Sequence, residues 1–420
     1  MLKVLVIGNG AREHTLVWKL SQSPRVEAIY AAPGNAGTDQ IACNLEISPT
    51  DIEGLLTAVA DYEIDLTVVG PEAPLAAGIV DRFQGLGLAV FGATRGAAQI
   101  ESSKVFSKEL MQKYGLPCAQ SASFSDYDEA KRYLRQHRLP VVIKADGLAA
   151  GKGVVVAESQ AEALAALADF MERKTLGGAG DRVLIEEHLA GREMSVFAFT
   201  DARTVAPVVT ACDYKRIYDG DRGPNTGGMG SYSPPHFLTP ELNESVTEQI
   251  MKPAVSALGS ENYPYQGILY GGLMINNSAP KVLEFNARFG DPETQVVLPR
   301  LKTDLVDIMM AIVRGKLDEI EIEWSEEACV GVVMASAGYP GSYKTGFTIR
   351  GLDQLEPDIM VFHAGTKPGD TPGEVVTSGG RVLTVAAGGE NIKEARDKVY
   401  RNISRISFEG SYYRQDIALF

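Results

Sequence analysis

Hydrophobic and polar positions in the first hundred residues predict alternating strands and helices. Residues 4–7 form an apolar, mostly β-branched run, which is typical of a buried parallel strand. A glycine turn follows, and the residues up to Leu20 have the spacing of an amphipathic helix. We expect further strands at 26–32, 66–69 and 88–91. Strands that alternate with helices predict a parallel, Rossmann-like sheet at the amino terminus.

The pattern changes after residue 102, where helices and longer β-branched segments follow one another without strict alternation. Helices are expected at 102–115, 126–136, 160–173, 244–258 and 309–314, and strands at 183–189, 267–275 and 281–285. A hairpin with a glycine-rich loop is expected at 140–156, and a separate β-rich module with a final helix at 392–403 begins near residue 324. We therefore predict an α/β and α+β multidomain protein with domains 1–102, 103–324 and 325–420, in which a lobe at about 120–191 bears the hairpin.

Composition and charge narrow the classes of function. The 420 residues include 40 Lys and Arg against 54 Asp and Glu, so the net charge is −14, which argues against general binding of nucleic acid or anionic membranes. The four Cys form no C-x-x-C pair, so neither a disulfide framework nor a thiolate zinc site is indicated. We also find no signal-peptide pattern and no apolar run long enough to span a membrane. We expect a cytoplasmic protein.

Three turns at predicted strand ends are candidates for binding a small anion. They lie at residues 8–10, 33–35 and 70–72, and ligands bind at the carboxyl ends of strands in open parallel sheets. Ordinary βα turns are the alternative. A nicotinamide or flavin cofactor is not favoured, because Glu13 stands at the third position of the G-x-G-x-x-G fingerprint and no acidic residue follows the second strand.

Two loops have the composition of functional segments. The glycine-rich loop at 147–153 departs from the Walker A spacing, and we expect a flap that closes over phosphates, with an ordinary surface hairpin as the alternative. The segment 212–232 is rich in turn formers and in charges of both signs. It predicts a mobile functional loop, and a disordered surface segment is the alternative.

The segment 281–295 carries a candidate metal site. Strand periodicity places Glu284 and Asn286 on the same face, and carboxylate and amide oxygens are ligands that Mg²⁺ accepts beside substrate phosphates. A strand end that runs into a charged surface loop is the alternative. His188, in contrast, is expected to be a half-exposed packing residue rather than a proton shuttle.

Four motifs resemble those of the phosphoribosylamine–glycine ligase family of ATP-grasp enzymes. They are G-N-G-A-R-E-H from residue 8, K-A-D-G-L-A-A-G-K-G-V from 144, G-P-N-T-G-G-M-G from 223 and R-F-G-D-P-E-T-Q from 288. The resemblance covers essentially the whole chain and implies an ATP-grasp fold with a Rossmann-like amino-terminal domain and a β-rich carboxy-terminal module. It also implies that glycine is joined to 5-phosphoribosylamine through glycyl phosphate, with ATP consumed, in purine biosynthesis.

The resemblance assigns roles to residues of this chain. ATP contacts are implied for Lys104, Lys144, Gly151, Lys152, Gly153, Glu186, Glu187, His188, Leu189 and Glu193. Glu284 and Asn286 would bind Mg²⁺ or Mn²⁺. Substrate contacts are implied for Asn9, Gly10, Asn35 and Glu72 with the phosphoribose, for Asp213 with the glycine ammonium, and for Lys215, Pro224, Asn225 and Thr226. Arg288 would bind the acyl-phosphate oxygens or the glycine carboxylate, and Arg288, Asp213 and Lys144 are the expected catalytic residues.

One departure and three alternatives remain open. Many ATP-grasp enzymes carry another acidic metal ligand on the preceding strand, where this chain has Tyr270, Gly271 and Gly272, so Glu293 is a further candidate donor. The alternatives are another ligase of the same superfamily, a nicotinamide oxidoreductase and a non-catalytic nucleotide-binding protein. We expect small-molecule partners only, and a monomer with a weak dimer as the alternative.

Overall fold

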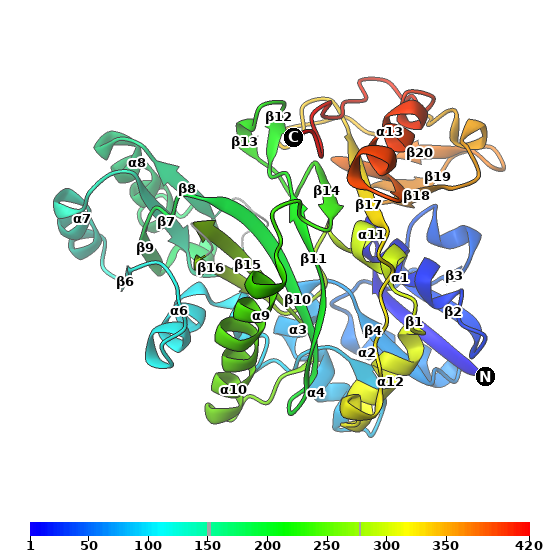
Figure 1. Ribbon diagram of the computed structural model, residues 1–420, viewed down its shortest axis with the longest axis horizontal. Helices are drawn as coiled ribbons and strands as arrows, with labels where there is room; N and C mark the ends of the chain where they lie inside the picture. The colour runs from blue at the N-terminus through cyan, green and yellow to red at the C-terminus, as the bar shows by residue number, and fades with distance from the viewer. Residues whose placement is uncertain (149–152, 277–278) are drawn as a thin grey trace.

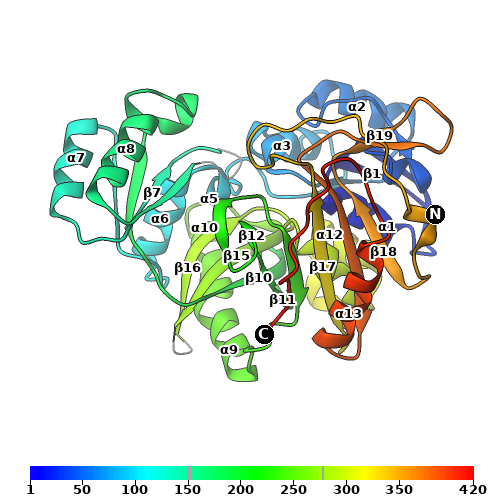
Figure 2. The same cartoon turned by 90° about the horizontal axis from the view of Figure 1, so that it is seen from above.

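The computed structural model describes residues 1–148, 153–276 and 279–420. Figures 1 and 2 show a parallel sheet from the amino-terminal part, a small lobe at the opposite end and a long antiparallel sheet between them. In the described part of the chain, no helix has both the length and the apolar content that crossing a membrane requires.

The amino-terminal sheet is parallel, as its hydrophobic pattern predicts. Its strand order is β3-β2-β1-β4-β5. The bounds are β1 Leu2–Gly8, β2 Val26–Pro33, β3 Cys43–Asn44, β4 Leu66–Val69 and β5 Val90–Phe91, with helices α1 Ala11–Leu20, α2 Ile52–Asp61, α3 Glu72–Ala77 and α4 Ile79–Gln84. Val4 and Val6 join one apolar core and Leu5 and Ile7 another, because both faces of β1 are covered.

The small lobe is an antiparallel sheet with two helices packed on it (Figure 1). Its strand order is β6-β9-β7-β8. The bounds are α5 Gln99–Ser102, α6 Lys104–Lys113, β6 Ser121–Phe124, α7 Tyr127–Gln136, β7 Val141–Ala145, β8 Val154–Ala157, α8 Gln160–Met171 and β9 Val183–Glu187. The antiparallel pairing of β7 with β8 confirms the predicted hairpin.

The central sheet has eight strands in the order β16-β15-β10-β11-β14-β17-β21-β18. Their bounds are β10 Arg192–Asp201, β11 Val205–Asp213, β14 Gly230–Ser233, β15 Gln266–Asn276, β16 Ala279–Asn286, β17 Ala328–Ala335, β18 Ile359–His363 and β21 Arg381–Gly389. The strands of the carboxy-terminal module therefore extend this sheet, since Gly230 of β14 pairs with Val332 of β17. Helix α13, Ile392–Ile403, packs against β21 and β17.

Two predictions differ from the structure in detail. The segment 212–232, expected to be a mobile loop, contains the paired strands β12, Arg216–Tyr218, and β13, Arg222–Asn225, and the buried strand β14. Sheet pairing supplies backbone partners that the turn-rich sequence does not reveal. The helix expected at 244–258 is interrupted, as α9 Pro240–Val246, a π-helical turn Thr247–Met251 and α10 Lys252–Ser260.

The remaining elements connect these sheets. They are α11 Thr294–Val297, α12 Leu305–Arg314, β19 Thr366–Pro368, β20 Val375–Thr377 and the short 3₁₀ turns Thr38–Gln40, Gly177–Gly180, Leu298–Arg300, Leu317–Glu319 and Leu352–Gln354. Helix α11 begins within the last two residues of the motif at 288–295 and lies between α1 and the central sheet. This connection brings the motif close to the carboxyl ends of the amino-terminal strands.

Candidate active site

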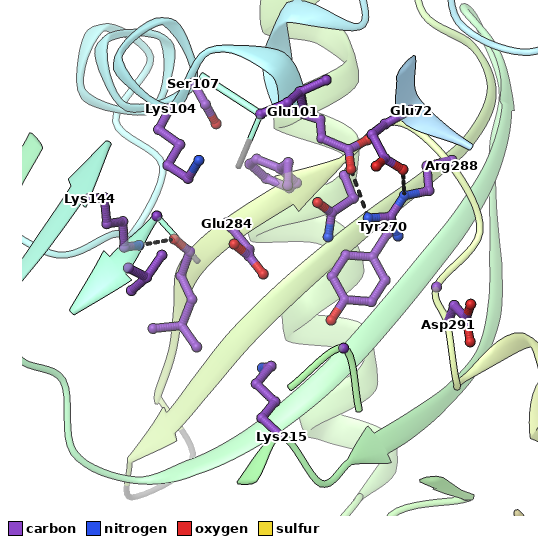
Figure 3. Close-up of a pocket in the computed structure, with 18 of the residues that line it drawn as sticks. Glu72, Glu101, Lys104, Ser107, Lys144, Lys215, Tyr270, Glu284, Arg288 and Asp291 are labelled. Carbon is purple, nitrogen blue, oxygen red and sulfur yellow. Dashed lines mark hydrogen bonds and ion pairs between the residues drawn. The ribbon is translucent and has the colours of Figure 1, made fainter. Parts of the chain in front are cut away.

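A cavity of about 470 Å³ lies between the amino-terminal domain, the small lobe and the central sheet (Figure 3). It brings together eleven of the residues predicted from the sequence: Glu72, Lys104, Lys144, Gly153, Glu186, Asp213, Lys215, Thr226, Glu284, Asn286 and Arg288. Seven basic and seven acidic side chains line its described walls, although the whole chain carries a net charge of −14. The charges that line the cavity therefore balance, unlike those of the whole chain, so an anionic ligand meets no net negative charge there.

Two lysines and one buried carboxylate form the end of the cavity nearest the hairpin. Glu186 on β9 makes ion pairs of 2.8 Å with Lys108 on α6 and with Lys144 on β7. Burial opposes the charge of Glu186, but Lys144 and Lys108 hold its pKa below the ordinary value. Lys144 Nζ also donates to the carbonyl of Leu283 (3.0 Å). The group carries one net positive charge in a fixed position, which suits a phosphate.

Lys104 ties the start of α6 to the base of the hairpin loop. Its Nζ donates to the Gly147 carbonyl (3.0 Å), and burial lowers its pKa although Glu284 opposes this. Asp146 accepts from Ser103 Oγ (2.9 Å) and from the Val105 amide (2.8 Å). These contacts fix the last described residues before the loop against the helix that carries Lys104.

Strand β16 places the two predicted metal ligands on one face, beside Tyr270 of β15 (Figure 3). Among the described residues, the Glu284 carboxylate has no hydrogen-bond or ion-pair partner. When the Asn286 amide is oriented so that its nitrogen faces Glu101, this nitrogen donates to Glu101 Oε1 (3.1 Å) and to the Phe285 carbonyl (3.3 Å), and the amide oxygen takes part in neither bond. One carboxylate and one amide oxygen fit a hard divalent cation that also binds phosphates. In the described part of the chain, no three acidic, His or Cys side chains are grouped closely enough to hold a metal. Glu293 lines the same cavity and stays a further candidate donor beside Glu284 and Asn286.

Arg288 is held between two carboxylates of the amino-terminal domain. Its Nη2 lies 2.8 Å from Glu101 Oε1, and its Nε donates to Glu72 Oε2 (3.3 Å). The Glu101 side chain is 6% exposed, whereas that of Glu72 is 34% exposed. Burial raises the pKa of Glu101 although Arg288 opposes this, and the Glu101 carboxylate also accepts from the Ala287 amide (2.8 Å). The Glu72 contact is thus the one that a ligand anion can replace more easily.

Asp213, Lys215 and Glu193 form a charged group at the end of β11. Lys215 Nζ lies 3.6 Å from Asp213 Oδ1 and also pairs with Glu193. Burial raises the pKa of Asp213 to about 7, with Lys215 opposing the shift and Glu293 adding to it. The Asp213 carboxyl therefore loses its proton more readily when a further cation lies near it.

The amino-terminal turns are arranged around Glu13 and Asn35. Glu13 is buried and its Oε2 accepts from the Gly10 amide (2.7 Å), while a Cβ at Gly8 would lie 2.5 Å from the Glu13 Cγ. This carboxylate at the start of α1 disfavours a pyrophosphate there. Asn35 Nδ2 donates to the carbonyls of Asn9 (2.9 Å) and His363 (2.8 Å), so Asn35 holds the turn to the carboxy-terminal module.

The remaining predicted residues lie outside the cavity lining or outside the described residues. Those outside the lining are Asn9, Gly10, Asn35, Glu187, His188, Leu189, Glu193, Pro224 and Asn225. Gly151 and Lys152 fall outside the described residues.

Sequence reasoning missed several cavity residues: Arg12, Glu101, Ser107, Lys108, Asp291, Tyr339 and Arg381. Lys108 had an available signal, because it follows Lys104 by four positions on one helix face. Arg12 and Asp291 had another, because each lies inside one of the four motifs.

Comparisons with known proteins agree with these motifs. Family models described as phosphoribosylglycinamide synthetase match this chain in three parts: the N domain at residues 2–101, the ATP-grasp (A) domain at 102–294 and the C domain at 329–419. A phosphoribosylamine–glycine ligase from Halalkalibacterium halodurans is 52% identical over 417 residues, which is 99% of this chain and 96% of the relative. One from Escherichia coli K12 is 49% identical over 420 residues, covering 99% and 98% of the two chains.

Solved structures show the same likeness. The crystal structure of a phosphoribosylamine–glycine ligase from Thermotoga maritima has a TM-score of 0.87 and 34% identity, and the match covers 99% of this chain and all of that one. A biotin carboxylase from Campylobacter jejuni has a TM-score of 0.74 at 15% identity over 98% and 93% of the chains, which shows a shared fold.

Proposed function

The chain belongs to the phosphoribosylglycinamide synthetase family, and from that premise we propose how its residues carry out the family's reaction. The protein is an ATP-dependent carbon–nitrogen ligase of purine biosynthesis that joins glycine to 5-phosphoribosylamine. The sequence resemblance is thereby confirmed. The residue roles below extend it to this cavity.

In the first step, a glycine carboxylate oxygen attacks the γ-phosphorus of ATP, the bond to the β–γ bridging oxygen breaks, and ADP leaves. Phosphoryl transfer depends mainly on positioning and on neutralising charge. Lys144, held by Glu186 and the Leu283 carbonyl, and Lys104, held by the Gly147 carbonyl, present fixed cations to the phosphates. The side chains of Leu184 and Leu283 line the same end and suit the flat face of adenine.

Glu284 and Asn286 are proposed to hold a divalent cation, Mg²⁺ or Mn²⁺. Such an ion would supply positive charge that offsets the charge developing on the phosphate during transfer. Support comes from the Glu284 carboxylate, which forms no hydrogen bond or ion pair with a described residue, and from the Asn286 oxygen, which no hydrogen bond uses when the amide nitrogen faces Glu101. Phosphate oxygens and water would complete the coordination.

Asp213 and Arg288 are proposed to position glycine. The ammonium group would supply the cation that favours the ionised form of Asp213. Arg288 would bind the carboxylate and then the acyl-phosphate oxygens in place of Glu72, the more exposed of its two partners. Glu72, released from this contact, would then be available to ribose hydroxyls at the carboxyl edge of the amino-terminal sheet.

In the second step, the nitrogen of 5-phosphoribosylamine attacks the acyl carbon, phosphate leaves, and the nitrogen loses one proton. The amine substrate is proposed to lie at the turns that carry Asn9 and Gly10, which follow β1 directly. Asn35 contributes indirectly, because its side chain fixes the Asn9 carbonyl. Lys215 and Thr226, at the other wall of the cavity, complete the enclosure around the reacting groups.

The observation that carries this proposal is that the lysine end, the β16 oxygen pair and Arg288 all line one cavity. ADP release by the purified protein, measured with each substrate omitted in turn, tests it. We expect continued release, beyond one ADP per protein molecule, to require glycine and 5-phosphoribosylamine together. Turnover with another amino acid in place of glycine, or with another amine, would instead favour a different ligase of the superfamily. The domains 1–102, 103–324 and 325–420, the cytoplasmic location, the monomeric state and the preferred metal stay predictions.

A further inference from the structure

Two side chains of the carboxy-terminal module reach the cavity, and both hold the same glycine. Tyr339 follows β17 and Arg381 begins β21, and both line the cavity. The Gly227 amide donates to the Tyr339 hydroxyl (2.9 Å), and the Gly227 carbonyl accepts from Arg381 Nη1 (2.6 Å). Both backbone groups of one residue in the motif at 223–230 are therefore held by a distant part of the chain.

Arg381 also holds the loop 290–292, which forms another part of the cavity wall. Its Nη1 donates to the Asp291 carbonyl (3.0 Å), and its Nη2 pairs with Asp291 Oδ2 at 2.9 Å. Although burial opposes it, the charge of Arg381 keeps the pKa of Asp291 below its ordinary value. Gly228 has φ +110°, and a Cβ there would collide with Pro292. The loops 226–228 and 290–292 therefore touch directly, and one guanidinium joins them.

The joined loops are connected by hydrogen bonds and by sequence to the groups proposed to bind substrate. The Thr226 amide and hydroxyl both donate to the Lys215 carbonyl (2.7 and 2.8 Å), and Lys215 lies beside Asp213. Asp291 follows Arg288 by three residues. A displacement of Gly227 would thus be passed to Asp213 through the contact of Thr226 with Lys215 and that of Lys215 with Asp213. Lys144, at the end of the cavity proposed to bind ATP, lies on a separate sheet in the small lobe.

We propose that Tyr339 and Arg381 are positioning residues, through which the carboxy-terminal module clamps loop 226–228 and sets the geometry of glycine binding. The identity of the bound substrate rests on the function proposed above. The clamp itself rests only on the contacts of Gly227 and Asp291. Neither side chain needs to touch substrate, because the hydroxyl and the two Nη atoms already have protein partners.

The test compares Tyr339→Phe, Arg381→Met and the double variant with two matched controls in the same module. Tyr400 also accepts from a backbone amide, that of Ile417 (3.1 Å), and Arg396 also donates to two backbone carbonyls, those of Gln415 and Ile417. Neither control residue lines the cavity. Tyr400→Phe and Arg396→Met therefore remove contacts with backbone groups of the same module without touching the clamp, and Tyr400→Phe also removes the bond from its hydroxyl to the Arg414 carbonyl (2.8 Å).

Two measurements distinguish positioning from general stability: amide hydrogen exchange of a peptide containing Gly227, and KM for glycine against KM for ATP. We expect exchange at Gly227 and KM for glycine to rise by about threefold to tenfold in Tyr339→Phe. The corresponding rise is about tenfold to a hundredfold in Arg381→Met, because a charged hydrogen-bond donor is lost. KM for ATP should change by less than about twofold. Arg381→Lys, which keeps the charge, should fall between wild type and Arg381→Met.

The double variant should show less than the product of the two single effects, because both side chains act on one loop. The proposal is overturned if exchange at Gly227 is unchanged in the single variants, or if KM for ATP rises by the same factor as KM for glycine. If the wild-type protein released no ADP with glycine while exchange at Gly227 still rose in the variants, the proposed function would be wrong and the clamp would be supported.

Discussion

Acidification from pH 7 to pH 5 should weaken the contact between the amino-terminal domain and strand β18, where two buried histidines meet. His14 of α1 is 7% exposed and His363 of β18 is 4% exposed. The His363 amide donates to His14 Nδ1 (2.8 Å), so this nitrogen must be unprotonated in the folded protein. A Cβ at Gly37 would lie 2.5 Å from the same nitrogen, which shows how closely the site is packed.

The magnitude follows from the pKa of His14. Burial, followed by the neighbouring His363, lowers the pKa of His14 from its ordinary value of 6.5 to about 3. Burial also lowers the pKa of His363, to about 4. Below pH 6.5 the unfolded chain takes up a proton at His14 and the folded protein does not, so stability falls as pH falls towards the folded pKa. The 1.5 units between 6.5 and pH 5 correspond to about 2 kcal/mol, at about 1.36 kcal/mol per unit.

His14→Asn isolates this contribution, because asparagine offers an oxygen near the position of Nδ1 and does not titrate. We expect the variant to be less stable than wild type at pH 7, since the ring also packs edge-on against Phe362. The difference in unfolding free energy, measured by urea denaturation at pH 7, 6 and 5, should shrink by about 2 kcal/mol at pH 5. Comparing the proteins at each pH cancels the titration of other groups, among them Asp213.

A matched control removes an exposed imidazole. His188→Gln should leave the difference from wild type the same at all three pH values, since His188 is exposed. A gap between wild type and His14→Asn that does not change with pH would refute the reasoning. It would mean that His14 is protonated in the folded protein as readily as in the unfolded chain, so that the bond from the His363 amide does not keep Nδ1 unprotonated.

Three further predictions concern the reaction. Glu284→Gln should lower turnover by about a hundredfold, which is about 2.7 kcal/mol at about 1.36 kcal/mol per decade. It should also raise the metal concentration needed for the half-maximal rate. If the variant needed the same metal concentration as the wild-type protein, the assignment would be contradicted. Arg288→Lys should lower kcat/KM for glycine by about tenfold or more, because an ammonium cannot keep the contact with Glu101 while also binding an anion at two points. Full activity of the variant in steady-state kinetics would exclude the two-point contact. Because burial raises the pKa of Asp213 to about 7, the free carboxyl is protonated below pH 7, and KM for glycine should rise as pH falls to 6. KM for glycine in Asp213→Asn should not change over this pH range. A wild-type KM that does not change with pH would disprove the ammonium contact.

Local sequence patterns determined much of the fold. The apolar run in β1 predicted a strand covered on both faces, and the structure places Val4 and Leu5 in two different cores. The antiparallel hairpin of β7 and β8 was likewise readable from β-branched residues around a glycine-rich loop. Such patterns depend on neighbours within a few residues, so they survive without knowledge of the tertiary structure.

The sequence also supplied eight of the fourteen charged side chains that line the described walls of the cavity, but not their partners. Alternation along β16 was enough to place Glu284 beside Asn286. It could not show that Lys144 pairs with Glu186, or that Arg288 pairs with Glu101, because any lysine or arginine can pair with any carboxylate. The turn-rich segment at 212–232 was similarly misleading, since its order comes from pairing with β11 and β17.

The sequence by itself therefore determined most of the strands and helices and many of the residues that carry chemistry, because periodicity and short motifs act over a few positions. Only the tertiary structure decided which of those residues face one another. It placed Gly227 between Tyr339 and Arg381, more than a hundred residues further along the chain, and it brought His14 against His363. Contacts of this kind depend on how whole sheets pack, and packing is a property of the folded chain that no local pattern records.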